Sequence, residues 1–330
     1  MTVAGETINK AKMAEKLSKE IFAEFLWQRM GPTNLNWPCE DEATHKVKTH
    51  PSDVVFYYEE PYRQARTYVN CDLKSYGKGS ITVGSIRSAI ESLARAISCA
   101  EKSEEFRTNF LHDHISPEIC GLLFVYNHDG EYDKDFNGLL TQIKNEKLDI
   151  PTKSKIVVFG PSDVYWLNNV HHEIAYMRGS AGVLPDRECC RYFYPHLVRR
   201  KNVQLEHAKA CTLEMLTAPW IVLSYTDPKK QNRKGFVVFC RQRGTSAEEY
   251  LYLIDYLMHY QVLVDGTDVF IKTLDAHPSA AAYFGKAKDQ YVDEYGGGID
   301  IKDRLNSIQF SQINDVRTKF SELELGMDNG

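Results

Sequence analysis

The sequence predicts an α/β protein of two domains, the first built on a mixed β-sheet flanked by helices. Three observations support this prediction. The chain has 330 residues, which is more than a single hydrophobic core usually serves. Apolar residues make up 43% and charged residues 26%, as in ordinary globular proteins. Runs with helical periodicity alternate with short apolar runs, a pattern typical of helices that cover a sheet.

The first half reads as α-β-β-α-β-α-β-α. Residues 13–30 and 84–100 carry apolar side chains at helical spacing and predict two helices. Between them, "SDVVFYYEEPY" and "ARTYVNCDLKSY" predict neighbouring strands of a meander. The runs "ICGLLFVYN" and "SKIVVFG" predict buried strands, and a helix follows from the cap Ser162 or Asp163. We expect these elements to form a domain over residues 1–182.

The second half has a rhythm of its own, with the order β-α-β-β-α-β. The runs "RYFYPHL", "WIVLSY", "GFVVFCRQ" and "DVFIKTL" predict strands, and "NVQLEHAKACTLEML" and "SAEEYLYLIDYLMHY" predict helices. This order is the ferredoxin-like arrangement. We therefore expect a smaller α+β domain over residues 183–330 that binds substrate or a partner.

Charge and cysteine usage limit the cellular setting. The net charge is −5, so a nucleic-acid partner has to be held by local basic patches. The eight cysteines show no C-x-x-C motif, which favours reduced thiols in an intracellular protein. The first twenty residues lack the apolar region of a signal peptide, and no apolar run reaches the roughly 20 residues that span a bilayer. We expect a cytoplasmic protein without a membrane partner.

A carboxylate and an amine stand two residues apart on the second predicted strand. Side chains of Asp72 and Lys74 share one face, about 7 Å apart along the strand. Leu73 between them points into the core, while its carbonyl can reach a bound metal. Asp53 opens the preceding strand, and antiparallel pairing brings it near Asp72. Two carboxylates beside a lysine are what metal-assisted phosphodiester hydrolysis requires.

These residues resemble the PD-(D/E)xK superfamily of restriction-endonuclease-like nucleases. The motif stands as "PSD" at 51–53 and "DLK" at 72–74, after a helix and before a helix and an apolar strand. The resemblance covers residues 10 to about 130, or to 178 at its widest, and implies a restriction-endonuclease-like mixed sheet. It implies that Mg²⁺ or Mn²⁺ is bound by Asp53, Asp72 and the Leu73 carbonyl, and that Lys74 positions or activates the attacking water.

The resemblance extends to further residues and to a biological role. Many members carry an acidic residue on the first helix, which here implies Glu20 as a catalytic residue and metal ligand, with Glu24 one turn on as the alternative. Lys78 after the motif is a candidate phosphate contact. A serine stands within the PD motif, and no glutamine follows Lys74 as in some members. The implied activity is a DNA endonuclease in prokaryotic phage defence or restriction, acting with a partner protein or as a homo-oligomer.

A basic turn lies in the second half, between two predicted strands. Phosphate contacts there would come from Lys229, Lys230, Arg233 and Lys234, without reading base sequence. "RRK" at 199–201 adds to the same charge. A solubilising hairpin and a docking surface for a partner subunit are alternative interpretations of these charges.

Other motifs are better explained by structure. His171 and His172 lack the i, i+4 spacing of a helical zinc site, and "NHDGEYDKD" lacks the twelfth-position Glu of a calcium loop. In "KGFVVFCRQ" Phe239 faces away from Phe236, which removes the stacking platform of an RNA-recognition module. Two alternatives to the nuclease remain: a subunit that binds RNA or DNA without cutting it, and a structural subunit of a larger complex.

Overall fold

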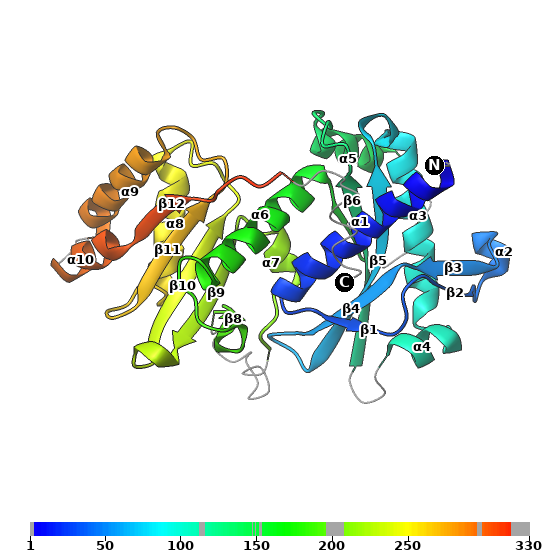
Figure 1. Ribbon diagram of the computed structural model, residues 1–330, viewed down its shortest axis with the longest axis horizontal. Coiled ribbons are helices and arrows are strands. Elements are labelled where there is room, and N and C mark those ends of the chain that lie inside the picture. The colour runs from blue at the N-terminus through cyan, green and yellow to red at the C-terminus, as the bar shows by residue number, and fades with distance from the viewer. Residues whose placement is uncertain are drawn as a thin grey trace. The chain divides into compact units, whose positions relative to one another are not determined.

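The computed structural model describes residues 3–111, 116–146, 148, 150–151, 154–195, 208–295 and 299–317. They form two compact units: unit 1 runs to Asn168 and takes up the chain again at Arg317, and unit 2 is Asn169–Val316 (Figure 1). The predicted boundary after residue 182 was meant to separate two independently folding domains, and it stays a prediction. Within the described chain, no helix combines the length and apolar character needed to cross a membrane.

A mixed five-stranded sheet forms the centre of unit 1, in the order β1-β4-β5-β6-β7. The strands are β1 (Gln28–Met30), β4 (Val54–Glu59), β5 (Ala65–Tyr76), β6 (Ser116–Asn127) and β7 (Ile156–Phe159). β4 and β5 are an antiparallel hairpin, whereas β5, β6 and β7 run parallel. The parallel connections carry α3 (Val83–Ala100), α4 (Glu104–Phe110) and α5 (Phe136–Asn145). This mixed α/β architecture agrees with the predicted fold class of the first domain.

Helices cover both faces of this sheet (Figure 1). On one face, α1 (Val3–Glu24) inserts Phe22 against Phe56 of β4 and Phe124 of β6, with ring centroids 5.2 and 6.0 Å apart. On the other face, the apolar stripe of α3 shares a buried cluster with Tyr68 of β5 and Leu123 of β6. A capping box between Thr82 and Ser85 fixes where α3 begins.

The segment between α1 and β4 differs from the prediction. The first helix ends at Glu24 instead of continuing to residue 30, because Leu26 adopts a left-handed conformation with φ 64°. A small excursion follows that the sequence did not predict, made of β2 (Leu35–Pro38), α2 (Glu42–His45) and β3 (Thr49–Ser52). β2 and β3 pair with each other as a separate two-stranded sheet.

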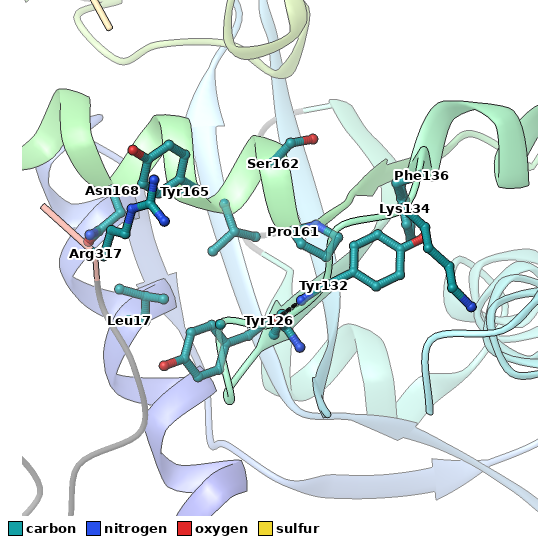
Figure 2. A pocket seen from close by; sticks show the side chains of 13 residues that line it. Leu17, Tyr126, Tyr132, Lys134, Phe136, Pro161, Ser162, Tyr165, Asn168 and Arg317 are labelled. Atoms are coloured by element: carbon teal, nitrogen blue, oxygen red, sulfur yellow. Dashed lines mark hydrogen bonds between the residues drawn. The ribbon is translucent and has the colours of Figure 1, made fainter. Parts of the chain in front are cut away.

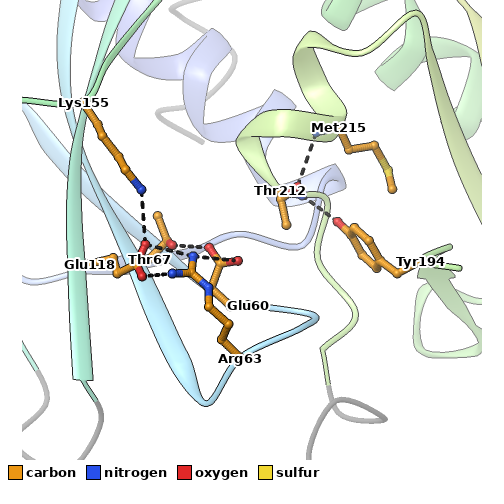
Figure 3. A network of polar contacts seen from close by, with 8 residues as sticks. All are labelled: Glu60, Arg63, Thr67, Glu118, Lys155, Tyr194, Thr212 and Met215. Atoms are coloured by element: carbon orange, nitrogen blue, oxygen red, sulfur yellow. Dashed lines mark hydrogen bonds and ion pairs between the residues drawn. The ribbon is translucent and has the colours of Figure 1, made fainter. Parts of the chain in front are cut away.

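The closed end of the β4–β5 hairpin is held by a network of compensated charges (Figure 3). Arg63 in the turn pairs with Glu118 of β6, and Lys155 Nζ lies 3.4 Å from the same carboxylate. Thr67 of β5 donates a hydrogen bond to Glu60. The network ties the hairpin turn to the parallel strands and so sets how β4 lies against β5.

Unit 2 has a sheet in the order β12-β11-β10-β9-β8. Its elements are β8 (Cys190–Tyr192), α7 (Leu213–Thr217), β9 (Trp220–Asp227), β10 (Arg233–Cys240), α8 (Ala247–His259), β11 (Asp268–Thr273), α9 (Ala280–Tyr295), α10 (Ile299–Ser307) and β12 (Gln309–Gln312). The ferredoxin-like prediction is not confirmed, because that arrangement inserts a strand between two parallel ones, whereas here neighbours in the sheet are also neighbours in sequence. β9 and β10 are a hairpin, and α8 crosses over to the parallel β11. The N–H of Thr212, the cap of α7, donates a hydrogen bond to the Tyr194 hydroxyl at 2.7 Å (Figure 3).

The two ends of unit 2 are bonded to each other. α6 (Pro161–Arg178) passes from unit 1 into unit 2, and its Asn169 bonds twice to the backbone of Val316. The Val316 N–H donates to Asn169 Oδ1 at 2.7 Å, and Asn169 Nδ2 donates to the Val316 carbonyl at 3.1 Å. The chain therefore leaves unit 2 beside the place where it enters.

Candidate active site

The open end of the β4–β5 hairpin brings the two predicted aspartates together. The antiparallel register pairs Val54 with Cys71, so Asp53, one residue before β4, comes opposite Asp72. The backbone N–H of Leu73 donates a hydrogen bond to Asp53 Oδ2 at 2.7 Å. The N–H and C=O of one strand residue face the same neighbouring strand, so the Leu73 carbonyl also faces the Asp53 side. Three oxygen-bearing groups therefore converge where the strands part.

Lys74 completes this cluster on the same face of β5. Its Nζ lies 2.6 Å from Asp72 Oδ1, as the period-2 geometry of a strand allows. Asp72 lies beside Leu123 of β6, so both charged side chains stand on the face that α3 covers. The Asp72 side chain is 14% exposed and that of Lys74 32% exposed. The cluster is thus largely shielded from water but accessible from one side.

Burial and mutual repulsion set the protonation of the site. Burial raises the pKa of Asp72; Lys74 counteracts this, and repulsion and a hydrogen bond from Asp53 raise that pKa further. Burial alone would lower the pKa of Lys74, but the attraction of Asp72 outweighs it, so the net pKa is raised. Two carboxyl groups and one ammonium therefore lie close together at this corner of the sheet.

The donor set fits a hard divalent cation. Mg²⁺ and Mn²⁺ take oxygen ligands, and the site offers two carboxylates and a backbone carbonyl within one corner of the sheet. The repulsion between Asp53 and Asp72 is the kind that a cation between them relieves. The assignment of these residues as metal ligands stays a prediction.

Glu20 lies on the helix that covers the sheet face opposite to Asp72. Glu20 is exposed on α1, where Lys16 Nζ lies 3.9 Å from its Oε1. Its helix packs through Phe22 on the sheet face opposite to the one that carries Asp72. Glu24, the alternative, is 3% exposed at the end of the same helix. A role for either glutamate in metal binding stays a prediction.

The candidate phosphate contacts are engaged with carboxylates. Lys78 follows β5, and its Nζ lies 2.8 Å from Asp133 Oδ2. In unit 2, Lys229, Lys230 and Arg233 lie 3.8, 3.4 and 2.6 Å from Asp186, Asp227 and Asp268, while Lys234 is exposed on β10. Their charge is thus partly neutralised within the chain. Their contact with nucleic acid stays a prediction, and the "RRK" segment at 199–201 lies outside the described residues.

One residue of this region was missed by the sequence analysis. Asn70 stands two positions before Asp72 on the same face of β5 and is fully buried. Neither its amide nitrogen nor its amide oxygen has a hydrogen-bond partner among the described residues. Buried amides are normally hydrogen-bonded, so this polar group is available to water or ligand beneath the carboxylates. The alternation Asn-x-Asp-x-Lys in the sequence was a signal that could have identified Asn70.

Unit 1 also contains a cavity of about 290 Å³ that is separate from the carboxylates. Figure 2 shows Tyr126, Tyr132, Phe136 and Tyr165 around it, with Leu17 from α1 at one side. Tyr126 belongs to the face of β6 that α1 covers, opposite to Asp72. The lining mixes aromatic, aliphatic and polar residues and contains none of the residues of the Asp53–Asp72 cluster.

Comparison with known families agrees with the geometry. Residues 1–163 match the model of the GAPS4 protein PD-(D/E)XK nuclease domain, and GAPS4 is a component of a phage defence system. Comparisons with curated proteins and with solved structures found no match. The matched region contains the five-stranded sheet and all of Asp53, Asp72 and Lys74. The resemblance to the PD-(D/E)xK nuclease superfamily is therefore confirmed over residues 1–163.

Proposed function

We propose that this protein is a Mg²⁺- or Mn²⁺-dependent endonuclease that hydrolyses DNA in defence against phages. The observation that supports this most directly is the convergence of Asp53 and Asp72 beside Lys74 at the open end of one hairpin. The family match supports the reaction class, since it covers the part of the chain that carries these residues.

In this proposal Asp53, Asp72 and the Leu73 carbonyl hold the cation. When bound, a divalent ion supplies a Lewis acid for a phosphoryl oxygen and lowers the pKa of a bound water. The Leu73 N–H donates a hydrogen bond to Asp53 Oδ2 and so fixes the orientation of the carboxyl group, which leaves Oδ1 to bind the cation. The site thus offers ligands whose positions are fixed by the strand register.

Lys74 acts as a charged hydrogen-bond donor. Because Asp72 keeps the pKa of Lys74 raised, the side chain is an ammonium at neutral pH. An ammonium orients the attacking water through its oxygen and offsets negative charge that develops on the phosphoryl group. We therefore assign Lys74 the role of positioning water and stabilising the transition state.

DNA as substrate and a partner protein or homo-oligomer are further parts of the proposal. They rest on the family resemblance and on the phage-defence context of the matching family. In this view unit 2 presents substrate or docks a partner, with the basic turn at residues 229–234 as the contact.

The test is plasmid cleavage with Mg²⁺, comparing wild type with Lys74→Ala, with and without candidate partners. We expect nicking by the wild type and a loss of about 10²–10⁴-fold in the variant, the range for removing one positioned catalytic group. Lys155→Ala is the matched control, since Lys155 pairs with Glu118 in the network at the other end of the hairpin. Its cleavage should stay within about twofold of wild type, because exposed ion pairs contribute little.

Mn²⁺ binding gives a second readout that needs no activating partner. Titration calorimetry should show a site in wild type that is lost in Asp72→Asn. Equal Mn²⁺ binding by both proteins would overturn the metal assignment. If both proteins bind DNA equally and neither cuts it nor binds Mn²⁺, the non-cleaving alternative is the correct one.

A further inference from the structure

A second cluster of metal-ligating side chains lies in the excursion between β1 and β4. Cys39 directly follows β2, His45 is the last residue of α2, and His50 lies in β3. The fourth member, Cys99, comes from the last turn of α3. One ligand atom from each residue can be chosen so that all four lie within 4.8 Å of one another.

The interatomic distances are those of a coordination sphere. The sulfurs of Cys39 and Cys99 are 3.8 Å apart, and His45 Nδ1 lies 3.3 and 3.4 Å from them. A tetrahedral ion with Zn–S bonds of about 2.3 Å and Zn–N bonds of about 2.0–2.1 Å places two sulfurs about 3.8 Å apart and a sulfur and a nitrogen about 3.5 Å apart. The side chains are therefore positioned for an ion without rearrangement of the backbone.

The protonation pattern of the two histidines suits coordination. His45 Nε2 lies 3.4 Å from Ser98 Oγ, and a proton on Nε2 leaves Nδ1 as a lone pair facing both sulfurs. The His50 ring is 2% exposed, and its Nε2 has no hydrogen-bond partner among the described residues.

If these four residues only filled the core, His50 Nε2 would stay buried without a hydrogen-bond partner among the described residues. All four side chains are buried, at 7, 8, 2 and 2% exposure for Cys39, His45, His50 and Cys99. A core at this position would be cheaper to build from aliphatic side chains, because a buried nitrogen without a partner is costly. A disulfide between the cysteines would leave the imidazole lone pairs unused. A metal ion satisfies all four residues at once.

The ligand types indicate which metal and which role. Two thiolates and two imidazoles in a tetrahedron favour Zn²⁺ over the hard cations that carboxylates select. Four protein ligands leave no open position for water, so the site is structural.

We propose that Cys39, His45, His50 and Cys99 form a structural Zn²⁺ site that fastens the β2–α2–β3 excursion to the end of α3. The excursion leads directly into Asp53: His50 is three residues before it, and Ser52 accepts a 2.9 Å hydrogen bond from Trp37 Nε1. The Asp53 carbonyl accepts from Asn34 N–H at 2.8 Å. As far as it concerns Asp53, the inference rests on the proposed nuclease function: the zinc would hold the strand that delivers this carboxylate.

Metal analysis of the purified full chain tests the site. We expect about one zinc per chain in wild type, and less than about a tenth of that in Cys39→Ser and Cys99→Ser, because a thiolate ligand is lost. Cys240→Ser is the matched control, since Cys240 is an equally buried thiol in unit 2. It should retain its zinc. Asp72→Asn should retain zinc as well, so failure of the nuclease proposal and failure of this one are distinguishable.

Cobalt substitution keeps the test valid if a serine variant folds poorly. The wild-type protein, reconstituted with Co²⁺ under reducing conditions, should show thiolate-to-cobalt charge-transfer bands and the d–d bands of a tetrahedral site. Wild-type protein that takes up neither Zn²⁺ nor Co²⁺ after reduction would overturn the proposal. So would a Co²⁺ spectrum without thiolate bands, or zinc that persists in Cys39→Ser and Cys99→Ser.

Discussion

Two ligand clusters flank the short segment from His50 to Asp53, and they differ in every property that selects a metal. The Asp53–Asp72–Lys74 cluster offers oxygen donors and is partly exposed, at 14% for the Asp72 side chain and 32% for that of Lys74. The Cys39–His45–His50–Cys99 cluster offers sulfur and nitrogen, is buried throughout and has four ligands. One stretch of chain thus contributes to both the proposed Mg²⁺ or Mn²⁺ site and the proposed Zn²⁺ site.

The two clusters are neighbours in the sequence, so their different roles follow from solvent access and from the type of donor atom. An open site exchanges water and substrate, which hydrolysis requires. A closed site exchanges nothing and can only hold the chain in place. Variants of the two clusters should therefore fail in different ways.

The largest effect should come from the open cluster. Asp53→Asn is expected to lower Mg²⁺-dependent cleavage by about 10³-fold, since removal of a metal's charged ligand costs several kcal/mol of transition-state stabilisation. Zinc content and melting temperature should be unchanged. Asp265→Asn is the control, an exposed carboxylate paired with Arg304. Loss of zinc together with activity in Asp53→Asn would show that the clusters are not separate, and measurement of both in one preparation decides this.

Substitution of a ligand in the Cys39–His45–His50–Cys99 cluster should lower the stability of the folded protein. Loss of zinc in Cys99→Ser is expected to lower the melting temperature by about 10 °C, given about 4 kcal/mol from a ligand present at a thousand times its Kd and 2–4 °C per kcal/mol for a domain of this size. Differential scanning calorimetry measures this, with Cys240→Ser as the reference for loss of a buried thiol. An equal decrease in both variants would remove any special contribution of Cys99.

A smaller effect is expected in metal-free protein, where the two clusters should change the free energy of unfolding with pH in opposite directions. The folded-state pKa of His50, about 4, lies below its ordinary 6.5, so its contribution is present above pH 6.5 and lost as pH falls through 4. The shift of 2.5 units corresponds to about 3 kcal/mol. Asp72 has the opposite sign: its raised pKa favours the folded state at low pH and is unfavourable as pH rises through that pKa. Unfolding measured between pH 7 and 4 should therefore show acid destabilisation that His50→Asn removes; an unchanged slope in that variant contradicts the assignment.

Strand chemistry made the open cluster predictable from sequence. Period-2 alternation places Asp72 and Lys74 on one face whatever surrounds them, and hairpin pairing brings the preceding strand's Asp53 alongside. The first helix was predicted less well, because its end depends on a left-handed Leu26 that no composition signal marks. The position of Glu20 depends on which face of the sheet the helix covers, a tertiary property.

The closed cluster was not predicted, for a different physical reason. Cys39, His45 and His50 stand within twelve residues, which was a usable signal, but the fourth ligand lies on α3. Only the packing of the excursion against the end of that helix joins them. Unit 2 shows the same limit: its element order was largely readable, whereas the order of strands in its sheet was not.

The paired hydrogen bonds between Asn169 and Val316 have an evolutionary consequence. A segment whose first and last residues are already hydrogen-bonded to each other can be lengthened, shortened or replaced while the chain on either side keeps its course. Residues 169–316 thus have the form of an insertion whose length and content can change while the sheet of unit 1 stays the same.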